Sequence, residues 1–353
     1  MRVAWKELEN PVIYPEYPWE GSITYVYGSA IKIGDKYRLY YQSFVEGIGY
    51  FVNLAESYDG INWRKPLIKK LKASIPRSYP TVEIDSNIED FYRKTSSLEC
   101  VSNVVSTYHS PTVIYRPGDE YPYKLFGYTS EGYCVSLSKD GINFMEYEGN
   151  PVIPLKRYPN RKTKKVWFSD VAPVFYDTKK RIYRAMVKTY KIDKEGRTRR
   201  CVGMSTSKDF INWTRPHTVW VPDESFDKIA WARGFSWADF YRLCVFNYED
   251  YYLGFLHLFL IEEEIPKGTH LGYIEVYLAR SENCIDWELV SDKPLIERKG
   301  WHTGNIQTVS FPVVEEGKIM IYFSGGGQKH GQWEIYGLDP SSKACIGLGF
   351  LEI

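Results

Sequence analysis

The stretch Ser57-Tyr58-Asp59-Gly60-Ile61-Asn62-Trp63 recurs three more times along the chain without gaps. The copies begin at Ser138, Ser207 and Ser281, so their starts lie 81, 69 and 74 residues apart. Each copy keeps the Ser, an Asp or Asn two residues later, an Ile and a closing aromatic residue. Self-similarity at such spacing indicates a repeat architecture, which decides the fold before any local pattern does.

Each repeat has the composition of a strand, a turn and a second strand. Asp-Gly and Asn supply the backbone conformations of a tight turn, and the alternating run before each Ser, such as Tyr273–Ala279, is typical of a β-strand. Two more strand-like runs come earlier in each unit, for example Pro173–Tyr176 and Ile182–Lys188. Four strands per unit correspond to one blade of a β-propeller.

A fifth unit begins near Ile306 but lacks the last, Trp-containing strand. The N-terminus carries that piece, because Trp5–Ile13 resembles Trp287–Ile296. We therefore expect an all-β, single-domain, five-bladed β-propeller whose ring is closed by the N-terminal strand pairing into the C-terminal blade, since closure removes exposed sheet edges. The expected blades cover residues 20–72, 105–156, 167–222, 238–298, and 303–353 together with 3–13. No useful length of helical periodicity is present, and the long connection 67–104 has the length of a functional loop.

Composition excludes several classes of partner. The formal net charge of +1 over 353 residues gives no overall attraction to nucleic acid or anionic membranes, and no apolar stretch is long enough for a membrane-spanning helix. Two basic runs, Arg161–Lys165 and Arg197–Arg200, are interpreted as solvated loops or hairpin tips. The six cysteines have no metal-binding spacing and residues 1–7 lack a signal-peptide core, so we expect a cytoplasmic protein without a cofactor. A metal held by His and carboxylates in the channel, and the oligomeric state, are left open.

Candidate site residues come from propeller geometry. The innermost strand of each blade lines the central channel, so polar residues just before these strands ring one mouth of it. Reading the five blades in order gives Glu20, His109, Asp170, Asp239, and His302 with Asn305.

The alignment between blades is firmer for some of these residues than for others. His109 and Asp170 fall in the same register, but Glu20 does not, and matching the first blade to the fifth places Tyr27 at the equivalent position instead.

Three carboxylates from different blades, Asp170, Glu20 and Asp239, would suit glycoside cleavage. One must be protonated to assist the leaving oxygen, another must be ionised to activate water or attack the sugar, and a third can tune the acid's pKa. The competing interpretation is that each carboxylate caps a turn or is a surface charge. The role of each acid, and a retaining or inverting outcome, stay open.

Other residues are candidates for substrate binding. Several Trp residues lie beside the mouth positions, where their rings can stack on a sugar or simply pack between blades, namely Trp19, Trp167, Trp237 and Trp301. His330 follows the loop Gly325–Gly327, which we interpret as a loop at the channel mouth. Glu275 lies in an apolar run and is either paired inside the core or part of the site.

At these residues the chain resembles uncharacterised five-bladed propellers of the glycosyl hydrolase type, which are related to glycoside hydrolase families 32 and 43. The resemblance rests on Pro18–Gly21, His109–Pro111, Ser169-Asp170, Asp209–Trp213, Tyr251–Gly254, Ile274–Val276 and His330-Gly331. It implies a propeller fold, a sugar ligand and acids in the first, third and a later blade. Asp170 matches the third-blade position, Glu20 replaces an expected Asp, Asp239 replaces an expected Glu, and the family-32 signature Asn-Asp-Pro-Asn-Gly is absent.

The leading hypothesis is a glycoside hydrolase that cleaves an oligosaccharide or glycoconjugate with paired carboxylates. One alternative is a phosphorylase, whose phosphate would be bound by His109, His302, His330 and Arg233. Another is a glycan-binding propeller without catalysis. In each case the near-neutral charge and the mouth-side Trp residues predict a neutral or weakly charged saccharide as the ligand.

Overall fold

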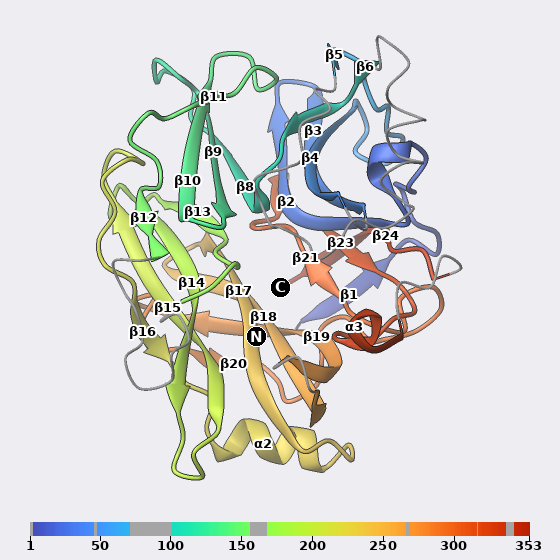
Figure 1. The fold of residues 1–353 in the computed structure, drawn as a ribbon, viewed down its shortest axis with the longest axis vertical. Helices are drawn as coiled ribbons and strands as arrows, with labels where there is room; N and C mark the ends of the chain where they lie inside the picture. The colour runs from blue at the N-terminus through green and yellow to red at the C-terminus, as the bar shows by residue number, and fades with distance from the viewer. Residues whose placement is uncertain are drawn as a thin grey trace.

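The computed structural model describes residues 3–45, 48–70, 101–155, 168–265, 269–315, 317–336 and 342–353. Five antiparallel sheets stand around a common centre as the blades of a β-propeller (Figure 1). From the innermost strand outward, blade 1 is β2 (Ile23–Ile33), β3 (Lys36–Val45), β4 (Gly49–Ser57) and β7 (Val104–Ser106), and blade 2 is β8 (His109–Tyr115), β9 (Tyr123–Thr129), β10 (Gly132–Ser138) and β11 (Met145–Glu146). Blade 3 is β13 (Val174–Asp177), β14 (Ile182–Ile192), β15 (Thr198–Ser207) and β16 (His217–Trp220), and blade 4 is β17 (Trp237–Tyr248), β18 (Tyr251–Glu264), β19 (His270–Ser281) and β20 (Glu288–Leu289). Blade 5 is β21 (Gln307–Thr308), β23 (Lys318–Gly325), β24 (Cys345–Glu352) and β1 (Ala4–Glu7).

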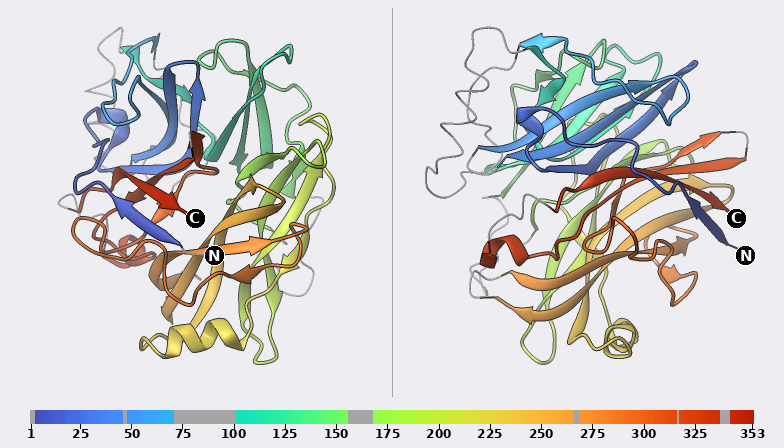
Figure 2. Two further views of the ribbon diagram at one scale, coloured as in Figure 1. Left: turned by 180° about the vertical axis from the view of Figure 1, so that it is seen from behind. Right: turned by 90° about the vertical axis from the view of Figure 1, so that its right-hand side faces the viewer.

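The ring is closed as the sequence predicts. Strand β1 pairs antiparallel with β24, from Ala4 opposite Glu352 to Glu7 opposite Gly349. The pairing continues beyond the strand, because the backbone N–H of Ile13 donates to Ile346 at 3.1 Å. Figure 2 shows the two terminal strands side by side in both of its views. The five-bladed propeller with an N-terminal closing strand is therefore confirmed.

Some details differ from the expectation. The outer strand of the first blade is β7, so this blade extends to residue 106 instead of ending near residue 72. Short helices also occur. One of them is α2 (Glu224–Trp231), whose N-terminus is capped by Asp223, which accepts the backbone N–H of Ser225. The remaining short elements are η1 (Pro18–Glu20), α3 (Gln332–Tyr336), β5 (Lys69–Lys70) paired with β6 (Val101–Ser102), β12 (Ile153–Pro154) beside β10, and β22 (Val313–Glu315) beside β23. Most of the connection 67–104 lies outside the described residues.

The sequence repeat forms a hydrogen-bonded turn directly after the third strand of each of the first four blades. In the third copy, Ser207 Oγ donates to Asp209 Oδ1 at 3.0 Å, and that oxygen accepts the backbone N–H groups of Ile211 and Asn212 at 2.9 and 2.7 Å. The Asn212 amide donates to Asp209 Oδ2 at 2.7 Å. Phe210 occupies the position of the expected glycine at φ 69°, and its complete burial offsets the strain of that conformation.

The inner strands are tied together around the axis. Arg242 on β17 is 2% exposed, and its guanidinium donates to the carbonyls of Val26 and Thr308 at 3.3 and 2.8 Å and to Ser310 Oγ at 3.0 Å. Ser310 Oγ also lies 2.8 Å from Thr112 Oγ1 on β8. These bonds join the inner strands of blades 1, 2, 4 and 5. None of the helices in the described part of the chain is long and apolar enough to cross a membrane.

Candidate functional site

A pocket of about 440 Å³ opens at the centre of the ring, and all five blades contribute to its wall. We call it the central pocket. Its aromatic lining is Tyr25, Tyr27, Phe44, Tyr50, Tyr190 and Tyr241. Its polar lining includes Gln42, His109, Asn305, Gln307, Gln328 and His330, and its charged lining is Asp170, Lys188, Arg200 and Lys329. Flat rings combined with amide and charged groups are typical of a site for a polar organic ligand.

Asp170 is placed in the pocket by the strand beside it. The backbone of residues 169–171 pairs with Lys188 on β14, because Ser169 N–H donates to the Lys188 carbonyl and Lys188 N–H donates to the Val171 carbonyl. This pairing brings Lys188 Nζ within 2.8 Å of Asp170 Oδ1, while His109 Nε2 lies 3.2 Å from Oδ2. The Asp170 side chain keeps 20% of its surface exposed, toward the pocket that it lines.

These contacts keep Asp170 ionised. Burial alone would raise the pKa of Asp170, but the charge of Lys188 and the hydrogen bond from His109 outweigh it and hold the pKa well below 3.8. The pKa of Lys188 is raised above 10.5, because the Asp170 charge outweighs the effect of burial there. The pocket thus contains a carboxylate–ammonium pair that stays charged at neutral pH.

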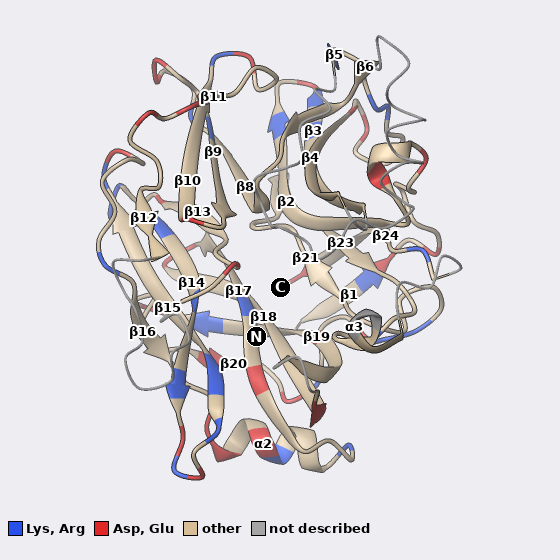
Figure 3. Cartoon of the chain, viewed as in Figure 1, with Lys and Arg blue, Asp and Glu red and all other residues tan. Residues whose placement is uncertain are grey.

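The last two residues of the second basic run are buried. Figure 3 shows acidic and basic residues gathered in the hairpin that joins β14 to β15, where this run lies. Arg199 and Arg200 are only 3% and 8% exposed, so the interpretation of this part as a solvated tip is wrong. Arg200 lies opposite Tyr190 in the β14–β15 ladder, and both line the pocket. The first basic run, Arg161–Lys165, lies outside the described residues.

Three of the expected binding residues also line the pocket, namely His109, Asn305 and His330. The Asn305 side chain accepts the backbone N–H of Ile274 at 3.2 Å, which fixes its amide. His330 Nδ1 lies 3.0 Å from the carbonyl of His270, so Nδ1 carries the hydrogen and Nε2 is an acceptor. Burial, followed by the charges of Arg200 and Lys188, lowers the pKa of His330 to about 3.

The alignment of the first blade favoured Tyr27 over Glu20, and Tyr27 is the one that lines the pocket. Its hydroxyl donates to the hydroxyl of Tyr241 at 3.1 Å across the ring. Glu20 lies instead in η1 and is fully buried. It accepts the Tyr41 hydroxyl at 2.5 Å, the Lys65 ammonium at 2.9 Å and the backbone N–H groups of Glu16 and Tyr17. The geometry makes Glu20 a structural carboxylate away from the pocket wall.

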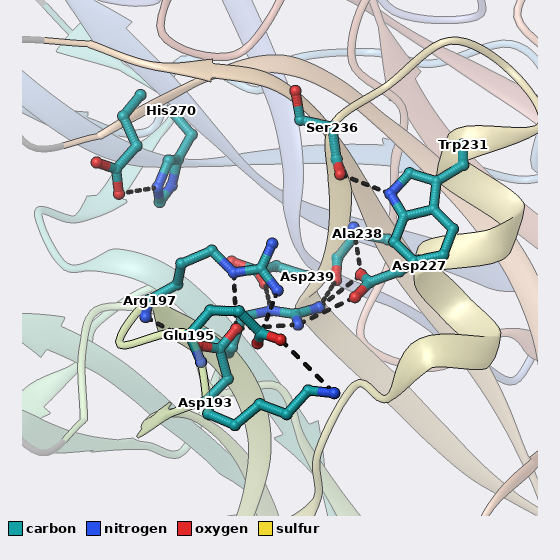
Figure 4. A network of polar contacts seen from close by, with 12 residues as sticks. Asp193, Glu195, Arg197, Asp227, Trp231, Ser236, Ala238, Asp239 and His270 are labelled. Carbon is teal, nitrogen blue, oxygen red and sulfur yellow. Dashed lines mark hydrogen bonds and ion pairs between the residues drawn. The ribbon is translucent and has the colours of Figure 1, made fainter.

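Asp239 belongs to a polar network behind the pocket wall (Figure 4). It is fully buried at the start of β17, and its Oδ1 accepts Arg199 Nε at 2.8 Å. Arg199 also pairs with Asp227 on α2 at 2.8 Å and with Asp193 at 3.5 Å. Burial raises the pKa of Asp239 above 3.8 despite the charges of Arg200 and Arg199. The network anchors α2 to the hairpin, and Asp239 is not among the residues that line the pocket.

Glu275 and His302 do not line the pocket, and each contacts another side chain. Glu275 accepts Arg233 Nη2 at 2.7 Å and Arg298 Nε at 2.6 Å, as the core-pairing interpretation predicts, and His302 lies 3.3 Å from Glu7. The phosphate-binding set of the phosphorylase alternative is therefore split, since Arg233 and His302 have these other partners.

The expected Trp residues pack between strands. Trp19 donates to Asn103 at 2.8 Å inside a core cluster, Trp301 stacks on Phe323, and Trp237 lies beneath the Arg197 guanidinium. None of these three lines the central pocket. Trp167 lies outside the described residues.

Several pocket residues were missed because their sequence signal is ordinary. Lys188 is a single cation in a strand, Arg200 belongs to a basic run interpreted as solvated, and Gln42, Tyr190 and Tyr241 are common strand residues. In the described part of the chain no group of three or more His, Cys, Asp and Glu is arranged to hold a metal ion. Among the described wall residues Asp170 is the one carboxylate. An ionised carboxylate in such a cavity can accept a sugar hydroxyl, activate water or stabilise a positive transition state.

No protein-family model and no curated protein sequence match the chain. Solved structures do match its fold. An α-L-arabinofuranosidase from Podospora anserina in complex with cellotriose matches with a TM-score of 0.58 at 12% identity, over 99% of this chain and 96% of that one. An N-acetylgalactosamine deacetylase from F. plautii in complex with blood group B trisaccharide gives 0.53 at 14%, over 99% and 94%.

A family-32 β-fructofuranosidase from Bombyx mori gives a TM-score of 0.52 at 14% identity, over 96% of this chain and 61% of that one. These proteins carry out different reactions, and the identities are low, so the likeness concerns the fold and not the chemistry. The resemblance inferred from the sequence is thereby confirmed at the level of architecture. The chain has a five-bladed β-propeller fold, which it shares with these solved structures.

Proposed function

We propose that the chain acts on a saccharide bound in the central pocket, as a glycoside hydrolase in which Asp170 is the ionised carboxylate of the reaction. The observation that carries the proposal is the position of Asp170, exposed to the pocket and held charged between Lys188 and His109. The aromatic lining supports a sugar ligand, because flat rings pack against sugar C–H faces while amides and hydroxyls bind its hydroxyls. The saccharides bound to two proteins of similar fold agree with this assignment.

In this proposal Asp170 is the base or the electrostatic stabiliser, since its pKa is too low for a proton donor at neutral pH. The Lys188 ammonium fixes its orientation, and His109 approaches its other oxygen. Most glycosidases pair such a carboxylate with a second, protonated carboxyl. Glu20, Asp239 and Glu275 are each engaged in other contacts, so these three are not proposed as the partner acid.

The same observation favours one alternative. With one carboxylate in the described wall, the pocket is also suited to a glycan-binding propeller that performs no cleavage. A panel of oligosaccharides, scored in parallel by thermal shift and by release of reducing sugar, separates the two functions. Stabilisation with turnover supports the hydrolase, whereas stabilisation without turnover supports the binding protein. If no saccharide gives either signal, both functions are refuted.

A further inference from the structure

The charged residues of the central pocket are not equally neutralised. Lys188 pairs with Asp170, and Lys329 pairs with Glu262 at 2.8 and 2.9 Å. Arg200 differs, because within the described residues its side chain donates one hydrogen bond, from Nη2 to Thr269 Oγ1 at 3.3 Å. Its Nη1 is out of solvent and has no hydrogen-bond partner.

The Arg200 side chain is nonetheless held in place. It is 8% exposed, and its guanidinium lies over the Phe259 ring at 4.8 Å from the centroid. The Arg200 charge opposes the rise that burial causes in the pKa of Asp239, but no hydrogen bond or ion pair joins these two described side chains. Asp239 Oδ1 instead accepts Arg199 Nε at 2.8 Å. A buried guanidinium without a bound carboxylate is costly in a folded protein. Such a cost is expected for a buried cation whose counter-charge is supplied by a bound ligand.

The electric field in the pocket has the sign that favours an anionic ligand. The Asp170 charge is offset by Lys188 at 2.8 Å, so it does not cancel Arg200. His330, on the same pocket wall, is held neutral by burial and then by the charges of Arg200 and Lys188. The wall formed by these residues therefore favours an anion over a cation.

We propose that the ligand is an acidic saccharide and that Arg200 binds its carboxylate, sulfate or phosphate group. This inference rests on the proposed function and narrows its substrate class. The planar guanidinium suits an oxyanion, since it can donate two parallel N–H bonds to two oxygens. The acidic saccharide replaces the neutral or weakly charged ligand that the sequence predicted. That prediction used the net charge of +1, which describes the whole chain and not the pocket.

The test is calorimetric titration with matched sugar pairs, each a methyl uronide and its neutral parent glycoside, alongside inorganic phosphate and sulfate at low salt. We expect at least one uronide to bind about 10- to 100-fold more tightly than its parent, the scale of a hydrogen bond to a charged group. Arg200→Gln should abolish this preference. Arg64→Gln, which removes a cation that is 78% exposed in the first blade, should leave the preference intact. Arg200→Lys, which keeps the charge but not the fork, should give an intermediate value and covers the case in which Arg200→Gln does not fold.

The outcomes separate the two claims. If neutral glycosides bind as tightly as the uronides, the acidic ligand is refuted while the saccharide function stands. If phosphate binds in an Arg200-dependent manner and no sugar does, the anion subsite holds with free phosphate as its source and the saccharide function falls. An uronide preference that survives in Arg200→Gln, or no Arg200-dependent binding of any anion, overturns the inference.

Discussion

The Nζ atom of Lys188 lies 2.8 Å from Oδ1 of Asp170, on the wall of a pocket that all five blades share. The distance follows from the backbone pairing of residues 169–171 with β14 and not from a flexible side chain reaching across a gap. It gives the pocket a carboxylate whose charge is fixed across the neutral range. Several measurable consequences follow from this pair and from the residues that surround it.

Removing the Lys188 charge should make the pocket sensitive to acid. In Lys188→Gln the burial of Asp170 is no longer outweighed by the ammonium, so the Asp170 pKa should rise. Ligand binding that needs the carboxylate should then weaken as the pH falls through the mildly acidic range, where the unchanged protein still binds. Titrations between pH 4 and 8 measure this. Lys180→Gln, at an exposed lysine, is the control, and identical pH profiles for all three proteins would contradict the assignment.

Glu20→Gln should cost stability without changing ligand binding. The Glu20 carboxylate is fully buried with the Lys65 ammonium at 2.9 Å, and the amide would place a donor where donors already converge. Loss of one partner of a buried ion pair costs about 3 kcal/mol of unfolding free energy. Urea unfolding measures the loss, and Glu9→Gln at an exposed site is the control. A stable Glu20→Gln protein with impaired ligand binding would return Glu20 to the site.

Stability should depend on pH through His330. Its pKa is lowered to about 3 in the folded chain and is about 6.5 when unfolded, so the unfolded state binds more protons between these values. Stability from this residue is therefore present above pH 6.5 and is lost as the pH falls toward 3. His330→Gln should flatten the decline of the melting temperature between pH 7 and 4. His217→Gln, at an exposed histidine, should not, and equal slopes in both variants would argue against a buried neutral His330.

The repeat turn can be tested by exchanging its two polar residues. In the fourth copy Asn283 accepts the two backbone N–H groups and Asp286 accepts the Asn283 amide, which reverses the order of Asp209 and Asn212. Asp209→Asn alone sets two amides against each other and should cost about 1 kcal/mol, the value of one hydrogen bond. Adding Asn212→Asp should recover most of that loss. A double-mutant cycle by denaturant unfolding measures the coupling, and strictly additive effects would show that the pair does not interact.

The sequence was sufficient for the fold because the propeller is encoded by local signals. The turn motif needs only its own seven residues, and Trp5–Ile13 carries the same pattern as the strands that it replaces. Asp170 could be predicted as well, because its register with His109 is a property of the repeat. Tyr27 shows that a gapless alignment locates the pocket better than residue chemistry does.

The remaining site residues depend on contacts that no local pattern records. From the sequence alone Glu20 is a plausible catalytic acid, but the structure pairs it with Lys65, which lies 45 residues away along the chain. In the same way, the structure pairs Asp239 with Arg199. For Arg200 the error runs the other way. The sequence places it in a basic run interpreted as solvated, but in the structure it lines the pocket, and its side-chain hydrogen bond goes to Thr269 and not to a carboxylate. Which charges are neutralised is decided by the tertiary structure.

The central claim is that Asp170 acts on a saccharide in the central pocket. The most direct measurement compares Asp170→Asn with the unchanged protein, using a saccharide identified by the ligand panel. The fold should be retained because the amide fills the same volume, although stability should fall because the buried Lys188 ammonium loses its carboxylate. Turnover should fall about 100-fold or more, the scale of lost acid–base catalysis. If the ligand is bound but never cleaved, its affinity should fall instead. Full turnover and full affinity in Asp170→Asn would contradict the account.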